Sequence, residues 1–128
     1  MAVDLKMPVL VVDDYKTMVR TIHALLSQLG FENVFEAGDG LSALELMRQQ
    51  KFGLVISDWN MEPITGYELL KRVRSDAGLK ATPFIMITAE AKSENITAAK
   101  QAGVDNYIVK PFNAETLKSR IAGVFGNF

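Results

Sequence analysis

The sequence predicts an α/β fold with a doubly wound, five-stranded parallel sheet and five helices. Short apolar and β-branched runs alternate five times with longer segments of helical periodicity. Three of the runs are almost continuously hydrophobic, as strands buried on both faces require. Parallel neighbours need right-handed helical crossovers, so the intervening helices should cover both faces of the sheet.

The strands are expected where β-branched residues gather. The runs centred on residues 9–12, 54–57 and 84–87 are almost entirely apolar, which is typical of central strands. The other two runs contain more polar residues. In chain order, the expected strands are Val9–Val12, Asn33–Glu36, Leu54–Ser57, Phe84–Ile87 and Tyr107–Val109.

The helices are expected where apolar residues recur at steps of three and four. Glycine should end the first helix at Gly30 and the fourth at Gly103. Asp39 or Gly40 should start the second helix, and Asn113 should cap the last. In chain order, the expected helices cover about Met18–Leu29, Leu41–Met47, Tyr67–Arg74, Ser93–Ala102 and Leu117–Phe128.

Length and composition narrow the class of protein. The 128 residues fit one domain, expected to span residues 1–128. A net charge of −1 provides no basic footprint for nucleic acid, and the absence of cysteine excludes disulfides and thiolate chemistry. No stretch approaches the roughly 18 apolar residues of a membrane helix. We therefore expect a cytoplasmic monomer that binds neither nucleic acid nor membrane.

Polar residues follow four of the expected strands. Asp13 and Asp14 come after the first, Asp58 after the third, Thr88 after the fourth and Lys110 after the fifth. Parallel sheets place function at the carboxyl ends of their strands, so these groups should meet at one edge. Carboxylates about 4 Å apart repel by roughly 4 kcal/mol at an effective dielectric constant near 20, unless something offsets the repulsion.

A hard divalent cation such as Mg²⁺ would offset this repulsion, since it prefers carboxylate, water and phosphate oxygens. Lys110 and Thr88 suit the oxygens of a phosphoryl group, and an aspartate can carry that group as an acyl phosphate. A simpler interpretation makes Asp13 and Asp14 only N-caps of the first helix. The joint placement at four strand ends favours a site.

Four segments of the chain resemble the receiver family of response regulators, in order and spacing. The resemblance covers essentially the whole chain and is strongest to receivers of the CheY type, which act in chemotaxis. The chain departs from the family pattern after Met61, where Glu62 stands in the usual place of proline and Pro63 follows. The matching segments are Val11–Asp14, Ile56–Met61, Thr88–Lys92 and Val109–Phe112.

The resemblance implies the flavodoxin-like receiver fold and a phosphoryl group carried on Asp58. It implies that Thr88 and Lys110 hold the phosphoryl oxygens and that the peptide bond between Lys110 and Pro111 is cis. Its implied Mg²⁺ site uses Asp14, Asp58 and the backbone carbonyl of Asn60, with Asp13 acting near the metal through water. These residues stand at matching positions of this sequence.

The resemblance also implies partners and a signalling face. The phosphoryl donor would be a histidine kinase of the chemotaxis type, in a Mg²⁺-dependent step, and the target would be the flagellar motor switch protein. Tyr107 matches the aromatic residue that changes position on activation. The residues that match the partner-binding face are Ala91, Ile96, Tyr107, Val109, Phe112 and Arg120.

Other functions were weighed on the same residues. A phosphatase of the haloacid-dehalogenase type has a second aspartate two residues after its nucleophile, whereas Asn60 follows Asp58 and Tyr15 follows Asp13 at that spacing. A flavodoxin-like flavin or nucleotide binder would have a Gly- or Ser/Thr-rich phosphate loop in place of Asp13 and Asp14. A phosphate sink, or a regulator of a target other than a motor, remains open within the receiver family.

Overall fold

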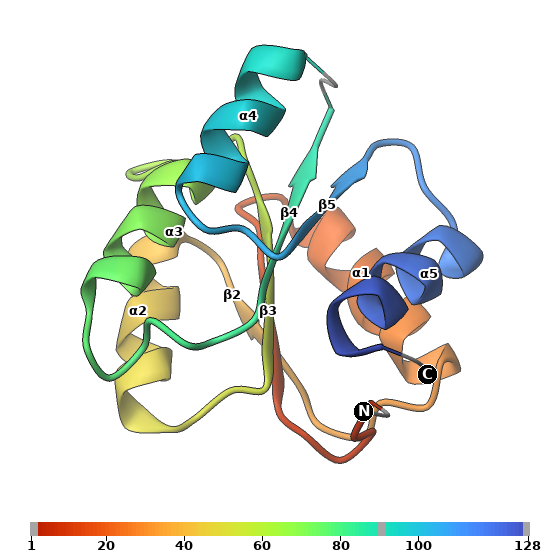
Figure 1. Ribbon diagram of the computed structural model, residues 1–128. Helices are drawn as coiled ribbons and strands as arrows, with labels where there is room; N and C mark the ends of the chain where they lie inside the picture. The colour runs from red at the N-terminus through yellow and green to blue at the C-terminus, as the bar shows by residue number, and fades with distance from the viewer. Residues whose placement is uncertain (1–2, 90–91, 127–128) are drawn as a thin grey trace.

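The computed structural model describes residues 3–89 and 92–126, and its five strands form one parallel sheet (Figure 1). The strand order across the sheet is β2-β1-β3-β4-β5. The predicted α/β class and the predicted parallel sheet are both confirmed. In chain order, the strands are β1 (Val9–Val12), β2 (Val34–Ala37), β3 (Leu54–Asp58), β4 (Phe84–Thr88) and β5 (Asn106–Val109).

The burial of each strand depends on whether it lies at the centre or at the edge of the sheet. Every residue of β1, β3 and β4 is buried, which matches the three apolar runs of the sequence. The strands β2 and β5 form the two edges, and each has only one buried residue. The more polar composition of these two strands therefore reflects their edge positions.

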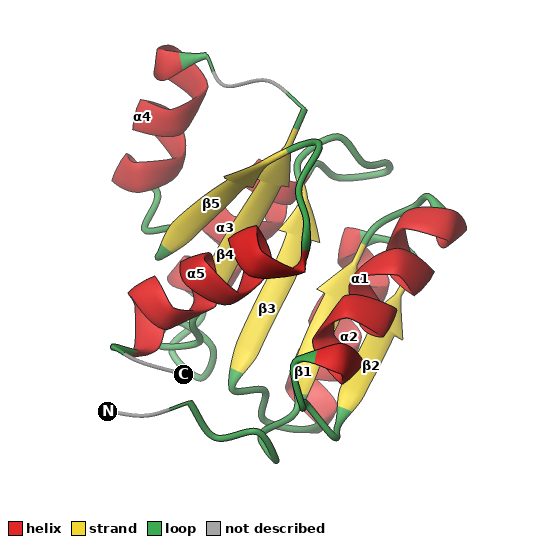
Figure 2. Ribbon diagram, turned by 90° about the vertical axis from the view of Figure 1, so that its right-hand side faces the viewer, coloured by secondary structure: helices red, strands yellow, loops and turns green. Residues whose placement is uncertain are grey.

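The helices also lie close to their predicted positions, and they cover both faces of the sheet. Figures 1 and 2 show α1 and α5 on one face, and α2, α3 and α4 on the other. None of the described helices is long and apolar enough to cross a membrane. In chain order, the helices are α1 (Lys16–Gln28), α2 (Gly40–Gln49), α3 (Gly66–Ser75), α4 (Ser93–Gln101) and α5 (Ala114–Phe125). The last residues of the predicted fifth helix, 127–128, lie outside the described residues.

Side-chain caps fix the starts of three helices. Asn113 accepts a hydrogen bond from the backbone N–H of Thr116, so the predicted cap of α5 is confirmed. The predicted start of α2 is confirmed as well, since the helix begins at Gly40 and Asp39 caps it by accepting a hydrogen bond from the N–H of Ser42. Thr65 caps α3 in the same way. Helix α1 differs, because its N-cap is Tyr15 and no side chain caps it. Asp13 and Asp14 are therefore not the N-cap of this helix.

Alternation along the buried strands divides the core into two layers. Val9 and Val11 of β1 face α1 and α5, where they pack with Ile22 and Leu117. Leu10 and Val12, on the opposite face, belong to the layer built with α2 and α3. Because both faces are apolar, the carboxyl ends of the strands are where this sheet presents polar groups.

Arg74, near the end of α3, binds four backbone or side-chain groups at the amino edge of the sheet. Its guanidinium donates to the carbonyls of Lys80, Thr82 and Gly103 at 3.0, 2.6 and 2.9 Å, and pairs with Asp105 at 2.9 Å. Asp105 also accepts from the N–H of Phe84, the first residue of β4, at 2.8 Å. This cluster joins α3, the loop before β4 and the turn between α4 and β5.

Gly66 lets α3 start directly against the end of β3. A Cβ at this position would collide with the carbonyl oxygen of Asp58 and would lie 2.9 Å from the sulfur of Met86. The N–H of Gly66 donates to the carbonyl of Trp59 at 2.8 Å, which closes the loop that follows Asp58. Any side chain here must push α3 away from the strand.

We expect Gly66→Ala to reduce the free energy of unfolding by about 2–3 kcal/mol, because the added methyl overpacks a backbone contact. The matched control is Gly38→Ala, where a Cβ would meet no atom within 4 Å. That control should change stability by less than about 0.5 kcal/mol. Urea unfolding measures both, and equal stability of the two variants would contradict the role assigned to Gly66.

Candidate functional site

Five polar residues from four strand ends converge at the carboxyl edge of the sheet. Asp58 and Thr88 are the last residues of β3 and β4, while Asp13 and Lys110 directly follow β1 and β5. Asp13, Asp58 and Thr88 are only 2%, 6% and 5% exposed, whereas Asp14 is exposed. Most of these groups are therefore withdrawn from water, which makes their mutual arrangement energetically important.

Lys110 supplies the positive charge that faces Asp58. Its Nζ lies 2.9 Å from Oδ1 of Asp58, and its backbone N–H donates to the carbonyl of Thr88 at 2.8 Å. The peptide bond between Lys110 and Pro111 is cis, as expected, and the bond between Glu62 and Pro63 is also cis. The contact between Nζ and Asp58 shows that the Lys110 ammonium is directed back over the end of the central strand, β3.

Asp13 is the least satisfied of the three carboxylates. Its Oδ1 accepts a hydrogen bond from the N–H of Tyr15 at 3.0 Å, but its buried Oδ2 has no hydrogen-bond partner in the described residues. Burial raises the pKa of Asp13 from 3.8 to about 6, and the charge of Asp58 adds to this effect. The Tyr15 hydrogen bond and Lys110 oppose the rise. The Oδ2 atom of Asp13 therefore has no hydrogen-bond donor that compensates its burial among the described residues.

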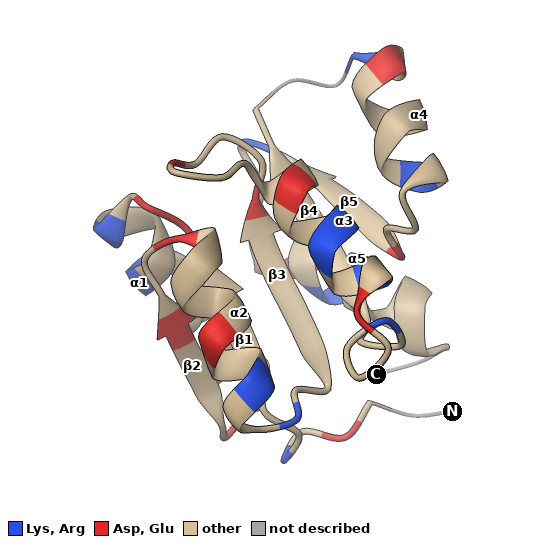
Figure 3. Ribbon diagram, turned by 90° about the vertical axis from the view of Figure 1, so that its left-hand side faces the viewer, with Lys and Arg blue, Asp and Glu red and all other residues tan. Residues whose placement is uncertain are grey.

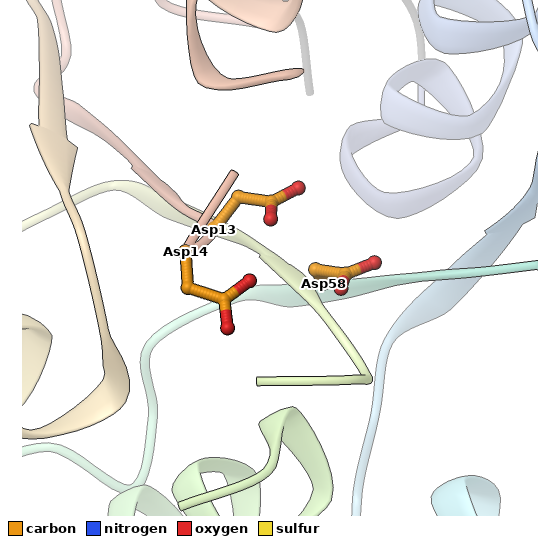
Figure 4. A group of neighbouring side chains, drawn as sticks. All are labelled: Asp13, Asp14 and Asp58. Atoms are coloured by element: carbon orange, nitrogen blue, oxygen red, sulfur yellow. The ribbon is translucent and has the colours of Figure 1, made fainter. Parts of the chain in front are cut away.

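The acidic cluster fits a hard divalent cation. One carboxylate oxygen from each of Asp13, Asp14 and Asp58 lies within 4.8 Å of the others. Figure 4 shows Asp13 and Asp14 next to each other after β1, with Asp58 across from them. An unpaired buried oxygen in an all-oxygen donor set is what Mg²⁺ binds in proteins. These residues are consistent with metal binding.

Asn60 lies within reach of this cluster. It shares with Asp14 a cavity of about 350 Å³ that Met61, Glu62 and Thr65 also line. The resemblance assigns the Asn60 carbonyl to the metal, and the position of the residue is compatible with that assignment. Glu62, which departs from the family pattern, adds a further carboxylate to the wall of this cavity.

Thr88 and Tyr107 share one face of the sheet. In the register of β4 and β5, Thr88 pairs with Val109 and Met86 pairs with Tyr107. Paired and alternate residues of parallel strands point to the same face, so Thr88 and Tyr107 are diagonal neighbours. The Tyr107 ring packs against the core layer of α2 and α3, and the guanidinium of Arg120 lies 5.3 Å from its centroid.

The six residues assigned to the partner-binding face do not all lie together. Tyr107 and Arg120 are in contact, and Ile96 and Val109 are half-buried on α4 and β5. Phe112 instead packs against the layer of α1 and α5 and lines a cavity with Met18 and Thr21. Ala91 lies outside the described residues.

An aromatic stack beside the site was not predicted from the sequence. The rings of Trp59 and Tyr67 are parallel within 5°, with centroids 5.3 Å apart. The ammonium of Lys71 lies 4.8 Å from the centroid of Tyr67 and pairs with Glu68 at 3.5 Å. Trp59 directly follows Asp58, the last residue of β3, so the stack joins the end of β3 to α3. The spacing of four residues between Tyr67 and Lys71 on a predicted helix was the sequence signal for their contact.

Comparisons with known proteins agree with this geometry. The response regulator receiver domain model matches residues 9–122. The chain is 51% identical over 119 residues to chemotaxis protein CheY-3 of Vibrio cholerae, and the alignment covers 93% of this chain and 92% of that protein.

Two solved structures share the fold. Chemotaxis protein CheY4 of Vibrio cholerae superposes with a TM-score of 0.87 at 36% identity, covering 93% of this chain and 98% of that one. The receiver domain of a sensor histidine kinase from Pseudomonas aeruginosa superposes with a TM-score of 0.85 at 25% identity, covering 95% and 99%. That receiver domain has a magnesium ion coordinated in its active site cleft.

The raised pKa of Asp13 predicts an unusual pH dependence in the absence of metal. The folded protein holds this proton more tightly than the unfolded chain does, so the free energy of unfolding should fall as the pH rises from 3.8 to about 6. The loss should be on the order of 3 kcal/mol. Asp13→Asn should remove this loss, because the amide does not titrate. Urea unfolding of both proteins across this window, with a chelator present, isolates the contribution of Asp13.

Mg²⁺ should reverse this destabilisation above pH 6, where Asp13 is ionised. At ten times its dissociation constant, the ion should add about 1.4 kcal/mol, or roughly 3–8 °C in melting temperature. Asp13→Asn should show a smaller gain. A melting temperature indifferent to Mg²⁺, or the same pH dependence in both proteins, would contradict the proposed cluster.

Proposed function

This chain belongs to the response regulator receiver domain family, and we propose that Asp58 is the residue on which it accepts a phosphoryl group. Its similarity to CheY proteins supports a phosphorylation-activated chemotaxis response regulator of the CheY type. The proposed donor is a histidine kinase of the chemotaxis type. The proposed target of the phosphorylated form is the flagellar motor switch protein.

The contact between Asp58 and Lys110 is the observation that carries the proposal. A buried carboxylate ends the central strand, and its Oδ1 is 2.9 Å from an ammonium. The ion pair offsets the cost of burying the Asp58 carboxylate, which is only 6% exposed and is the nucleophile in the proposed transfer. After transfer, the same ammonium is positioned to bind a phosphoryl oxygen, and the buried hydroxyl of Thr88 can bind another.

Asp13, Asp14, Asp58 and the carbonyl of Asn60 are the groups that would hold Mg²⁺. The chemistry that the bound ion supplies is neutralisation of the negative charge on the transferring phosphoryl group. Support comes from the unpaired Oδ2 of Asp13 and from the mutual distances of the three carboxylates, within 4.8 Å. The chain's own residues then orient the acceptor and limit the access of water to it.

The proposed output is a change of shape on the face formed by α4, β5 and α5. Phosphorylation adds close to two negative charges and three acceptor oxygens. Thr88 and Lys110 would move toward these oxygens, and the space that Thr88 leaves is open to its diagonal neighbour Tyr107. The phosphorylated and free proteins are thus two populations, and the modification shifts the balance between them.

The acceptor assignment predicts the result of labelling with acetyl phosphate and Mg²⁺. The parent should acquire a phosphoryl group that hydroxylamine releases, because it is an acyl phosphate. Asp58→Asn should not be labelled, since an amide cannot act as this nucleophile. Intact-mass spectrometry measures the modification, and the emission of Trp59, the only tryptophan, reports on the same site. Equal labelling of parent and variant would show that another residue is the acceptor.

The proposed coupling predicts a separation between labelling and output. Thr88→Ala and Tyr107→Ala should both still be labelled on Asp58, because the carboxylate that accepts the phosphoryl group is retained. Labelling of Thr88→Ala should be slower, since this variant lacks the hydroxyl assigned to a phosphoryl oxygen. Both should weaken the phosphorylation-dependent gain in affinity for the motor switch protein, by about 1–3 kcal/mol of coupling free energy. Titration of the switch protein against free and phosphorylated forms measures this gain. Undiminished coupling in both variants would exclude the route through Thr88 and Tyr107.

A further inference from the structure

A cavity of about 420 Å³ opens beside the acidic cluster, between α1 and the carboxyl end of β2. Asp13 and Asp14 form the wall nearest to Asp58. The opposite side has a mixed character, because α1 contributes basic residues and β2 contributes an acidic one. The residues that line the cavity are Asp13, Asp14, Lys16, Val19, Arg20, Glu36, Ala37 and Gly38.

Lys16 and Arg20 are the cationic residues of this cavity. They lie four residues apart on α1 and therefore on the same face of the helix. Both are exposed, and neither side chain forms an ion pair or hydrogen bond with any residue in 3–89 or 92–126. Glu36, in contrast, is held by His23, with Nδ1 of the histidine 2.7 Å from Oε2. Figure 3 shows basic positions at the start of α1 near acidic positions of β2 and the neighbouring loops.

The unpaired cations matter because the rest of the approach to Asp58 is acidic. Asp13, Asp14 and Glu62 all lie around the acceptor, and Lys110 is already paired with Asp58. A small phosphodonor carries two negative charges near neutral pH, so these carboxylates repel it over the last several ångströms. Unpaired positive charges at the entrance are the groups that can offset this repulsion before contact.

We propose that the cavity between α1 and β2 is the approach site for small dianionic acyl phosphates, which Lys16 and Arg20 attract toward Asp58. This inference rests on the proposed function of Asp58. In the transfer itself, an oxygen of the Asp58 carboxylate bonds to phosphorus while the bond from phosphorus to the acyl oxygen breaks. With acetyl phosphate, acetate leaves with the electron pair and the aspartyl phosphate retains two negative charges.

Lys16 and Arg20 act in this scheme through their electrostatic field and not as catalytic residues. The structure places neither of them in contact with Asp58, so they should affect the rate of encounter and leave the chemical step unchanged. A field effect grows with the charge of the donor and fades as salt shortens the Debye length. Loss of a merely structural contact would follow neither rule.

The test compares second-order labelling rates of Lys16→Gln/Arg20→Gln and the parent, at fixed Mg²⁺ and sub-saturating donor. With acetyl phosphate at low ionic strength, the variant should be slower by roughly three- to tenfold, and the difference should shrink in 0.5 M salt, where the Debye length is only about 4 Å. Phosphoramidate carries about one negative charge, so the electrostatic free energy that the variant loses should be about half as large. Its labelling rate should therefore fall only by about the square root of the factor seen with acetyl phosphate. Glu36→Gln should accelerate labelling by acetyl phosphate, because it removes a negative charge from the same cavity.

The matched control is Arg48→Gln/Lys51→Gln, which makes the same change in net charge. These two residues lie near the end of α2 and before β3, at the amino ends of the strands and away from Asp58. This control should label at nearly the parent rate. Equal loss in both double variants, or a loss that is independent of salt and donor charge, would overturn the approach site. Failure of the parent to label on Asp58 would instead refute the proposed function on which the site depends. Melting temperatures of all variants establish that each is folded.

Discussion

The position of three carboxylates at the end of a buried sheet is the constraint that governs this molecule. Both faces of the sheet are covered by helices, so polar groups that follow the strands are brought together at one edge. Lys110 offsets one negative charge by pairing with Asp58. Asp13 is left with a buried oxygen that has no partner in the described residues and with a pKa raised to about 6. The protein thus keeps a locally unfavourable arrangement of negative charge, which an added cation can relieve.

The two faces of the sheet carry different functional groups next to this edge. The face of α1 and α5 carries the basic residues of the approach, and the cavity there leads to Asp13 and Asp14. The opposite face carries Thr88 and Tyr107, and Trp59 stacks there on Tyr67 of α3. Entry of a donor and transmission of a signal can therefore occur on different sides of one sheet.

Sequence reasoning succeeded where a local rule decides the structure. Apolar runs identified the buried strands, periodicity identified the helices, and Asp39 and Asn113 were recognisable as caps. It failed where contacts join distant segments. Nothing local indicates that Arg74 reaches Asp105, or that Gly66 must lack a side chain because of the carbonyl of Asp58. Asp13 and Asp14 also resembled a helix cap, but Tyr15 takes that position. Phe112 packs against the layer of α1 and α5, and its assignment to the partner face stays a prediction.

Arg74 anchors the turn after α4 at the end of the sheet remote from Asp58. Its hydrogen bond to Gly103 and its pair with Asp105 hold the turn that follows α4, while α3 and the loop before β4 supply the other side of the contact. The carboxyl end of α4 is therefore anchored to α3, whereas its amino end lies toward the edge of the sheet that carries Asp58. Because its carboxyl end is anchored next to Gly103, a displacement of the amino end of α4 would tilt the helix about that anchored end and would not slide it along the sheet.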